Sequence, residues 1–270
     1  MKDVADNKRP TDFAGVAMVT GGAAGLGSEL VRQLAARGGC VLAVDRDRQG
    51  LDRLVSESAG WKGRVDALAC DLARPGAAEE LLDRCDSLGL RVDTLVNNAA
   101  DALYGETVEM DVDRLAGMLL CNGLTLTLLC RLFGERMAAA GGGRIMNVSS
   151  IAGYQPAPLI GAYAATKTYI RYLSRALARE LSPAGVQVTC FLPGMLRTEL
   201  MARAGMGHTK FYKRSLSAGM APEQAARHAL KAMDNGGGSV IPGVGPRVQA
   251  AMSRMLPDML VARASRRMMT

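Results

Sequence analysis

The chain has few of the residues that build metal centres and nucleic-acid surfaces. It has only 2 histidines in 270 residues, and its 6 cysteines stand singly, without the paired spacing of zinc ligands. Aromatic residues make up 4 % of the chain, and no basic face interleaved with aromatics is evident. We therefore expect neither a metal site nor a nucleic-acid partner.

Long uninterrupted apolar runs are also missing. The best candidate for a membrane span, residues 115–130, is interrupted by Asn122 and Gly123 and flanked by arginines. The N-terminus is charged rather than apolar, so no secretory signal is expected, and residues 1–12 are expected to form a loose lead-in. Because scattered, unpaired cysteines suit a reducing compartment, we expect a cytoplasmic protein.

Short apolar runs alternate with helical stretches along most of the chain. The runs cover residues 16–19, 40–44, 64–69, 94–97, 144–147, 187–191 and 239–241. Such alternation predicts an α/β fold, with a parallel sheet covered by helices on both faces. A chain of 270 residues can bury one large core, so we expect a single domain over residues 13–246 and a tail over 247–270.

A glycine-rich turn, TGGAAGLG, occupies residues 20–27. It follows an apolar run and precedes residues 28–37, in which apolar side chains recur at helical spacing. Strand, glycine turn and helix form the context in which such a motif binds a dinucleotide. Gly21 would permit the tight turn, Gly25 close approach of the backbone to a pyrophosphate, and Gly27 close packing of the helix.

Two residues at the end of the second apolar run bear on the choice of cofactor. Asp45 stands 24 residues after Gly21, near the spacing at which a carboxylate meets the ribose hydroxyls of NAD. The same carboxylate would repel the 2′-phosphate of NADP, whereas Arg46 could pair with it. On this balance we expect NAD(H) to be favoured over NADP(H).

Tyr163 and Lys167 stand one helical turn apart, so their side chains share a helix face. A cation beside a phenol lowers the tyrosine pKa, which helps the phenol to donate or accept a proton. Ser150, 13 residues upstream at the end of an apolar run, could hold a substrate oxygen beside it. This constellation predicts proton transfer in a redox or elimination step.

Together these motifs resemble those of the short-chain dehydrogenase/reductase family, in the branch with TGxxxGxG and YxxxK motifs. The matching segments occur in the family's order: Thr20–Gly27, Cys70-Asp71-Leu72, Asn97-Asn98-Ala99-Ala100, Asn122, Asn147-Val148-Ser149-Ser150, Tyr163–Lys167, and Pro193-Gly194 with Thr198. Ala100 departs from the usual glycine by one methyl group, and we expect no loss of cofactor binding from it. The resemblance implies a Rossmann-type, doubly wound sheet of seven parallel strands in a single domain.

The resemblance also implies a role for each matching residue. Tyr163 would donate the proton in carbonyl reduction or accept it in alcohol oxidation, Lys167 would assist it, and Ser150 would orient the substrate oxygen. Asn122 would help to hold a water-filled proton relay, although it could instead cap a break in its helix. The expected cofactor-binding set is Thr20, Gly21, Gly25, Leu26, Gly27, Asp45, Arg46, Asp71, Leu72, Asn98, Ala99, Tyr163, Lys167, Pro193, Gly194 and Thr198.

Substrate choice is expected to lie in residues 199–220, the variable insertion after the Pro-Gly turn. Lys210, Lys213 and Arg214 could meet an anionic group there, or be solvated. The chain's ending resembles that of bacterial reductases similar to 3-oxoacyl reductases, so an apolar or acyl-like substrate is expected. The candidate substrate-binding residues are Tyr104, Tyr154, Met195, Met201, Met206, Phe211 and Tyr212.

The formal charge of +7 is concentrated at the C-terminus, where residues 247–270 carry five arginines and one aspartate, a net of +4. Methionine and leucine run through the same segment. A basic amphipathic tail could touch an anionic membrane, lie on a partner subunit or cover the substrate cleft. Packing on protein is the preferred interpretation, and membrane contact is the less favoured one.

The function that best joins these features is NAD(P)-dependent interconversion of a secondary alcohol and a ketone. Two alternatives stay open: a non-catalytic protein that senses the cofactor, and a cofactor-retaining dehydratase or epimerase. The presence of Tyr163, Lys167 and Ser150 weighs against the first. The resemblance further implies a homodimer or homotetramer that pairs through helices around residues 115–137 and 163–181.

Overall fold

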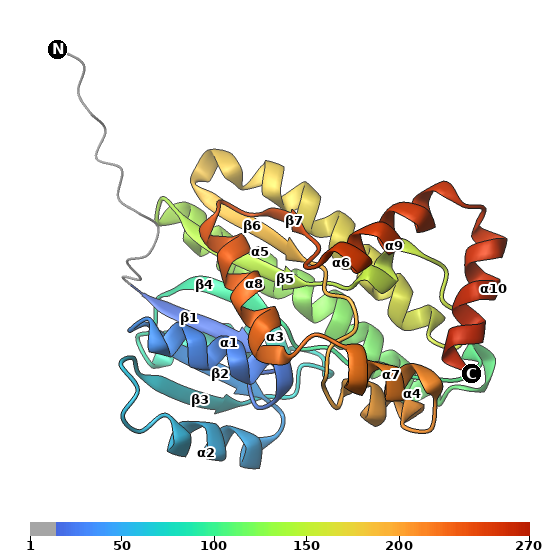
Figure 1. Ribbon diagram of the computed structural model, residues 1–270. Helices are drawn as coiled ribbons and strands as arrows, with labels where there is room; N and C mark the ends of the chain where they lie inside the picture. The colour runs from blue at the N-terminus through green and yellow to red at the C-terminus, as the bar shows by residue number, and fades with distance from the viewer. Residues whose placement is uncertain (1–14) are drawn as a thin grey trace.

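The computed structural model describes residues 15–270, so the expected lead-in at residues 1–12 lies outside the described residues. Within the described chain, one sheet of 7 parallel strands has the order β3-β2-β1-β4-β5-β6-β7 (Figure 1). Each strand falls on one of the seven predicted apolar runs, which confirms the expected α/β fold. The strands are β1 (Val16–Thr20), β2 (Cys40–Asp45), β3 (Val65–Ala69), β4 (Val92–Asn97), β5 (Gly143–Val148), β6 (Val186–Phe191) and β7 (Gly238–Val240).

Helices cover both faces of this sheet. Alternate side chains of a strand point to opposite faces, so in β2 Val41 and Ala43 pack into one core while Leu42 and Val44 pack into the other. The first core contains α1 (Gly25–Ala36), α2 (Arg48–Glu57) and α8 (Pro222–Asp234); the second contains α3 (Ala77–Ser87), α5 (Leu126–Ala139) and α6 (Gly161–Glu180). Burial on both faces explains why the strands read as near-continuous apolar runs.

The strand order reverses next to β1, and this reversal positions the site. The chain proceeds from β1 outward to β3 and then returns to β4 on the other side of β1. Loops that leave β1 and β4 therefore diverge and open a crevice at the carboxyl ends of the strands, where dinucleotides bind in such folds. The two loops are also tied together, because the Asn98 amide Nδ2 donates to the carbonyl oxygen of Thr20 at 3.0 Å.

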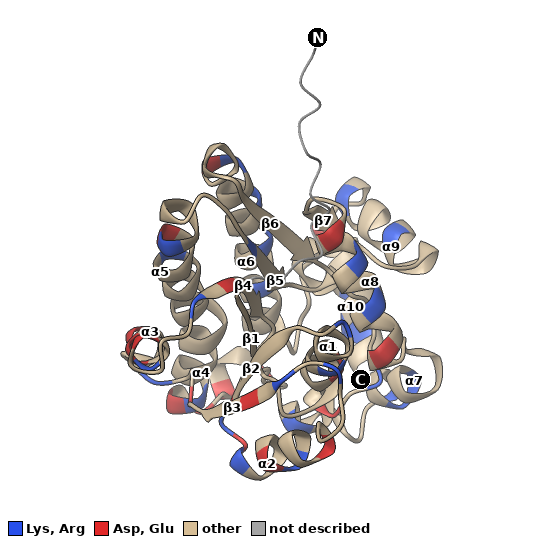
Figure 2. Cartoon of the chain, turned by 90° about the vertical axis from the view of Figure 1, so that its left-hand side faces the viewer, with Lys and Arg blue, Asp and Glu red and all other residues tan. Residues whose placement is uncertain are grey.

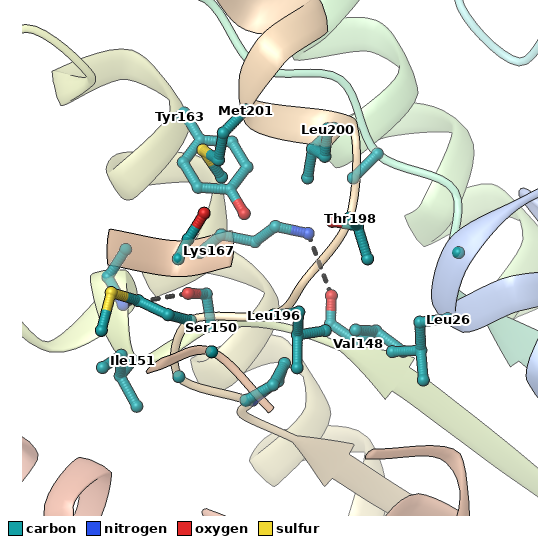
Figure 3. A pocket seen from close by; sticks show the side chains of 18 of the residues that line it. Leu26, Val148, Ser150, Ile151, Tyr163, Lys167, Leu196, Thr198, Leu200 and Met201 are labelled. Carbon is teal, nitrogen blue, oxygen red and sulfur yellow. Dashed lines mark hydrogen bonds between the residues drawn. The ribbon is translucent and has the colours of Figure 1, made fainter. Parts of the chain in front are cut away.

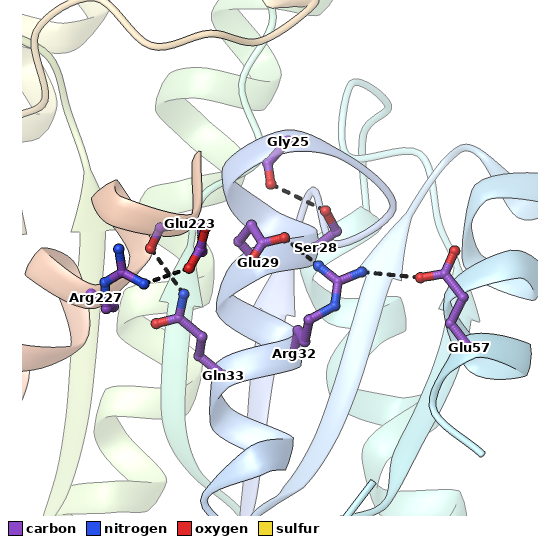
Figure 4. Close-up of polar contacts among 8 residues, drawn as sticks. All are labelled: Gly25, Ser28, Glu29, Arg32, Gln33, Glu57, Glu223 and Arg227. Carbon is purple, nitrogen blue, oxygen red and sulfur yellow. Dashed lines mark hydrogen bonds and ion pairs between the residues drawn. The ribbon is translucent and has the colours of Figure 1, made fainter. Parts of the chain in front are cut away.

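The helix after the glycine turn is anchored on both flanks (Figure 4). The Gln33 side-chain amide donates to the backbone carbonyl of Glu223 at 2.9 Å, which ties α1 to the start of α8. Arg32 pairs with Glu29 on its own helix and with Glu57 of α2, the latter at 3.0 Å. Exposed ion pairs stabilise by at most about 1 kcal/mol each, so the buried apolar face of α1 accounts for most of its attachment.

The helix through Asn122 is longer than the sequence indicated. The segments α4 (Val112–Leu119), η2 (Leu120–Thr125, a π-helical turn) and α5 run continuously, and together they are 28 residues long and apolar enough to cross a membrane. The expectation that no apolar segment is long enough to cross a membrane is therefore wrong by length and composition. A π-helical turn keeps the backbone helical through Asn122 and Gly123, and the buried face of this helix packs into the core of the fold, a place where helices of this kind are also found.

Two helices extend past the last strand. They are α9 (Val244–Met255) and α10 (Asp258–Met269), and they form the edge of the molecule farthest from α2 and β3 in Figure 1. On its inner side α9 is held through Ser253, whose hydroxyl donates to the Gln155 side-chain oxygen at 3.0 Å. Helix α10 returns towards α7 (Lys210–Ala218), so its C-terminal end meets the segment expected to choose the substrate.

Candidate active site

A single cavity of about 970 Å³ contains most of the predicted site residues. It begins at the glycine-rich turn and continues past the start of α6 to α7 and α10. Its size lies at the upper end of the range for small-molecule sites, about 300–1,000 Å³. The predicted residues that line it are Gly21, Gly25, Leu26, Asp45, Arg46, Asp71, Leu72, Asn98, Ala99, Ser150, Tyr163, Lys167, Pro193, Gly194, Met195, Thr198, Met201 and Phe211.

Tyr163 and Lys167 lie side by side on α6 and point into this cavity (Figure 3). Both side chains are buried, with exposed fractions of 5 % and 2 %. The lysine Nζ lies 5.5 Å from the centroid of the phenol ring and donates to the carbonyl oxygen of Val148 at 3.0 Å. One face of one helix therefore presents a phenol and an amine to the same space.

Burial controls the proton affinities of this pair. Burial raises the pKa of Tyr163 to about 12, and a hydrogen bond with Ser150 opposes that rise. Burial also lowers the pKa of Lys167 to about 8, because the charged amine loses its hydration. Desolvation is the largest cause of the shift in the tyrosine pKa and acts opposite to the lowering expected from Lys167, whose effect on the phenolate stays a prediction. At neutral pH the phenol is protonated, the form that donates a proton to a carbonyl.

Two adjacent serines after β5 have different surroundings. The Ser149 hydroxyl is buried and donates to the backbone carbonyl of Lys167 at 2.7 Å, which fixes α6 against the strand. The Ser150 hydroxyl lines the cavity beside Tyr163 and accepts the Ala152 N–H at 3.1 Å. Ser150 is therefore the serine that a substrate oxygen can reach, while Ser149 is structural.

The glycine-rich turn has the shape that a phosphate cradle requires. Gly21 has φ of +65°, and a Cβ there would lie 2.9 Å from the Ala99 Cα. A Cβ at Gly27 would lie 1.9 Å from the Gly21 carbonyl oxygen, so only glycine lets α1 start so close to the turn. Helix α1 has no side-chain N-cap and no acidic residue in its first turn. Its first N–H groups are thus available to an anion.

Two residues of the predicted cofactor set support the turn from beneath the cavity. Gly27 and Thr20 are absent from the cavity wall that the described residues form. The Thr20 hydroxyl accepts the backbone N–H groups of Asn98 and Ala99 at 3.1 and 3.0 Å and donates to Val96 at 3.3 Å. Their part is to hold the loops after β1 and β4 in place.

Charged residues gather where the end of β2 meets the cavity. The Asp45 carboxylate accepts the Ala23 N–H and the Asp47 N–H, each at 3.0 Å, and so faces the glycine-rich turn. Arg46 is mostly exposed, and its guanidinium lies 3.8 Å from the Asp101 carboxylate on the opposite wall. Sequence reasoning missed Asp101, for which the only signal is its position directly after the Asn97–Ala100 motif.

Asn122 lies fully buried in the π-helical turn η2. Its amide is saturated by backbone and hydroxyl groups: Oδ1 accepts the Asp101 N–H at 2.9 Å, and Nδ2 donates to the Asp101 carbonyl at 2.8 Å and to Thr166 at 3.2 Å. The alternative that Asn122 caps a break in its helix is wrong, because the helix continues. Asn122 holds the loop that carries Asp101, and its part in a proton relay stays a prediction.

Two tyrosines expected at the substrate lie outside the cavity wall. The Tyr104 hydroxyl donates to the carbonyl oxygen of Met269 at 3.1 Å, so this ring supports the end of α10. The Tyr154 ring, at the end of η3 (Ile151–Tyr154), lies under the Arg171 guanidinium, which is 3.8 Å from the ring centroid. Both are corrections that follow from contacts with residues distant in the sequence.

Three residues of the 199–220 insertion are corrected in the same way. Met206 is completely buried in a core cluster beside the cavity. The Tyr212 hydroxyl donates to the Glu199 carboxylate at 3.2 Å and faces away from the cavity. Lys213 is exposed and lies outside the cavity wall, whereas its helix neighbours Lys210 and Arg214 line it.

The cavity is electrostatically polarised. Its acidic lining residues, all near the ends of β2, β3 and β4, are Asp45, Asp47, Asp71 and Asp101. Its basic lining residues near α7 and α10 are Arg203, Lys210, Arg214 and Arg267, and none of these has an ion-pair partner among residues 15–270. No residue in the last turn of α10 was predicted to line the cavity, although the basic charge and the methionines of this segment were evident in the sequence.

Fold and cavity together define a dinucleotide-binding α/β protein with a buried tyrosine, lysine and serine at one end of the cleft. A model of the short chain dehydrogenase family matches residues 15–207, which is more than half of the chain. The protein therefore belongs to the short-chain dehydrogenase family, and the resemblance drawn from its motifs is confirmed.

Individual relatives agree with this assignment. The chain is 32 % identical to D-threitol dehydrogenase of Mycolicibacterium smegmatis over 71 % of this chain and 74 % of that protein. It is 34 % identical to dehydrogenase/reductase SDR family member 4 of Bos taurus, over 68 % of this chain and 66 % of that relative's length. The solved structure of a short-chain dehydrogenase from Sphingobium yanoikuyae in complex with NADPH superposes with a TM-score of 0.79 at 30 % identity, covering 89 % of this chain and 93 % of that one.

Proposed function

We propose that this protein is an NAD(P)-dependent oxidoreductase that interconverts a ketone and a secondary alcohol. The observation that carries the proposal is the convergence of Tyr163, Lys167 and Ser150 on a cavity that continues to the glycine-rich turn. A dehydratase or epimerase that retains its cofactor would use the same residues. Net reduction of a ketone with oxidation of the cofactor separates the two.

The chain's own groups have complementary parts in this reaction. When bound, the nicotinamide cofactor supplies or accepts a hydride. The Ser150 hydroxyl holds the substrate oxygen, and the phenol of Tyr163 donates its proton to that oxygen as charge develops. The Lys167 amine, held by Val148, stabilises the phenolate that remains. In the oxidative direction the phenol must first lose its proton, which its raised pKa opposes at neutral pH.

We further propose that NAD(H) is preferred over NADP(H). Asp45 directs its carboxylate into the cleft beside the glycine-rich turn, where it can accept hydrogen bonds from ribose hydroxyls. A carboxylate has about four acceptor sites, so the two backbone N–H groups that it binds leave room for them. The Arg46 guanidinium lies 3.8 Å from the Asp101 carboxylate, a partner that a 2′-phosphate would have to displace.

A titration with NADH and NADPH, followed by calorimetry, tests the cofactor assignment, and Tyr163→Phe tests the chemistry. We expect tighter binding of NADH, and in the variant a loss of more than tenfold in turnover with nearly unchanged cofactor affinity. Retention of more than a tenth of the activity would refute the role of Tyr163. Binding of neither cofactor would refute the enzyme, and cofactor binding without turnover of any ketone or alcohol would favour the sensing protein.

The substrate is proposed to be apolar, with an anionic end. Near Tyr163 the wall includes Leu200 and Met201, which suits an alkyl or ring system. Farther out, the basic lining residues of α7 and α10 lack acidic partners within the described chain. Such a gradient fits a keto acid or a long acyl group that ends in a negatively charged carrier.

A matched pair of substrates tests this class: a keto acid and the neutral methyl ketone of equal length. Neutralising Lys210 and Arg214 to glutamine should lower kcat/KM for the acid by about tenfold or more and leave the neutral ketone nearly unaffected. Lys213→Gln is the control, because Lys213 is on the same helix outside the cavity wall. Equal effects of both changes on both substrates would contradict an anion site.

Assembly and compartment are proposed on separate grounds. Apolar side chains stay exposed on the outer faces of α4, η2 and α6: Leu119 at 46 %, Leu124 at 53 %, Tyr169 at 46 % and Tyr172 at 58 %. A homodimer or homotetramer that pairs these helices would cover them, and light scattering tests it. All six cysteines are free thiols, which supports placement in the reducing cytoplasm.

A further inference from the structure

The two helices beyond the sheet carry an unusual amount of exposed apolar surface. Of the 17 large hydrophobic side chains exposed in residues 15–270, eight lie from Val244 onward. Four of them, Val244, Val248, Met252 and Met255, recur at helical spacing and form one stripe along α9. The stripe continues into the corner before and after Pro257 through Leu256, Met259 and Leu260, exposed by 44 %, 69 % and 53 %. We call these seven residues the tail surface.

The tail surface faces outward because the opposite sides of both helices pack against the protein. The opposite side of α9 is occupied by Ala250 and Ser253, which are buried against the body of the protein. On α10 the inner side is formed by Val261, Ser265 and Met269. The fold therefore uses one side of each helix and leaves the apolar stripe of α9 and the start of α10 uncovered. Packing on protein, the preferred interpretation of the tail, explains the inner sides alone.

Arginines flank the tail surface. Of the five in this segment, Arg266 pairs with Glu106 and Arg247 binds the Ile241 carbonyl; Arg254, Arg263 and Arg267 have no ion pair or hydrogen bond within the described part of the chain. Figure 2 shows blue bands and no red band along α9. The segment's one acidic residue is Asp258. An apolar strip with a basic border is the pattern of a helix that lies in a lipid interface.

Charge also argues against a second copy as the occupant. A two-fold interface places the same patch against itself, so the arginines of one tail would face those of the other. No acidic cluster on the tail could neutralise them, since its residues 247–270 carry a net charge of +4. An anionic lipid surface can interact with both parts, because its acyl chains suit the apolar strip and its phosphates suit the basic border.

We propose that the tail surface docks this protein on the surface of anionic phospholipid membranes. Methionines and leucines of the α9–α10 corner enter the boundary between headgroups and acyl chains, and the arginines contact lipid phosphates. The last turn of α10 also lines the cavity through Arg267, Met268 and Met269. Docking therefore brings the mouth of the active-site cavity close to the lipid, which suits an apolar, anionic substrate. That consequence rests on the proposed function; the docking itself does not.

Co-sedimentation of the full-length protein with vesicles tests the docking without any substrate. Phosphatidylcholine vesicles are compared with vesicles that also contain phosphatidylglycerol, at low and high salt. We expect binding to the anionic vesicles only, weakened by salt, and weakened about fivefold by each of Arg254→Gln and Arg263→Gln. Met255→Glu with Met259→Glu should abolish it. Leu88→Glu, a change of another exposed apolar residue at the end of α3, is the control and should bind normally.

Several outcomes would overturn the proposal. Absence of binding to either vesicle would do so, as would binding that the methionine variants do not affect, which would place the contact elsewhere. Equal binding to both vesicles would refute the part assigned to the arginines. The tail surface is instead a contact between subunits if two results coincide. The unmodified protein does not bind vesicles, and light scattering shows that the methionine substitutions dissociate an oligomer. If the variants turn over a soluble ketone at an unchanged rate, their active site is intact.

Discussion

Lys167 is a buried cation, and its charge should make the protein less stable at neutral pH than an apolar substitute would. The side chain is 2 % exposed, and its pKa falls from 10.5 to about 8 in the folded protein. A difference of that size corresponds to roughly 3 kcal/mol of unfavourable burial at pH values below both constants. Replacement by methionine removes the charge and keeps the length of the side chain.

The pH dependence has a definite sign. Between about pH 8 and pH 10.5 the unfolded chain binds the lysine proton while the folded protein has released it. Because the unfolded state then binds more protons, the stability of the unmodified protein rises with pH across this window. The variant lacks this titration. Its advantage over the unmodified protein should therefore shrink by roughly 2 kcal/mol between pH 7 and pH 10.

The expected net effect also includes a lost hydrogen bond. Lys167 donates to the Val148 carbonyl at 3.0 Å, and loss of that bond costs about 1–2 kcal/mol. Lys167→Met should thus be about 1–2 kcal/mol more stable at pH 7 and no more stable than the original at pH 10, while its turnover is lost. For a domain of this size, 1 kcal/mol corresponds to about 2–4 °C in Tm.

Thermal unfolding of the cofactor-free protein and variant at pH values from about 7 to about 10 measures this difference. Lys231→Met is the control, because Lys231 is exposed on α8 and the change should leave the Tm difference independent of pH. A constant difference between Lys167→Met and the original over the whole range would refute the assignment of a costly buried charge. An advantage of the variant over the original that is smaller at pH 7 than at pH 10 would refute it as well.

Three further predictions follow from the cavity and the turn. Asp45→Ser should weaken NADH binding by about tenfold and bring NADPH to equal or higher affinity in calorimetry, because a charge-assisted acceptor is lost and the repulsion of a phosphate is removed; an unchanged preference would show that Asp45 does not select the cofactor. Gly27→Ala should lower the free energy of unfolding, measured in urea, by about 1–3 kcal/mol and should weaken the binding of NADH, since its Cβ would lie 1.9 Å from the Gly21 carbonyl oxygen. Gly123→Ala, with open space around the added methyl group, should be neutral or stabilising, and equal losses in both would contradict the packing argument. Ser150→Ala should lower kcat more than cofactor affinity, and an unchanged kcat would exclude it from substrate orientation.

Local patterns in the chain were enough to predict the elements that carry the chemistry. Each of the five inner strands coincides with a short apolar run because both of its faces are buried, and this condition is visible in the composition of the run itself. The pairing of Tyr163 with Lys167 follows from helical spacing alone. The glycine-rich turn is similarly local, since the clash that excludes a side chain at Gly27 involves a residue six positions away.

Burial and distant contacts were beyond that kind of inference. The pKa of Tyr163 rises because the whole cavity wall removes water from the phenol, although its nearest charged neighbour in the sequence predicts the opposite direction. Tyr104 lies away from the substrate because it binds Met269, 165 residues later in the chain. Asn122 holds the loop that carries Asp101 because its side-chain amide binds the backbone N–H and carbonyl of that residue, 21 positions earlier in the chain.

The sequence by itself therefore determined which groups the protein has for its chemistry and on which elements they stand, because helical and strand periodicities are properties of neighbouring residues. The tertiary structure decided the protonation state of those groups, the sign of charge at each end of the cavity and the unused apolar side of α9. These depend on which residues exclude water from one another, and that is settled only when segments far apart in the chain are packed together.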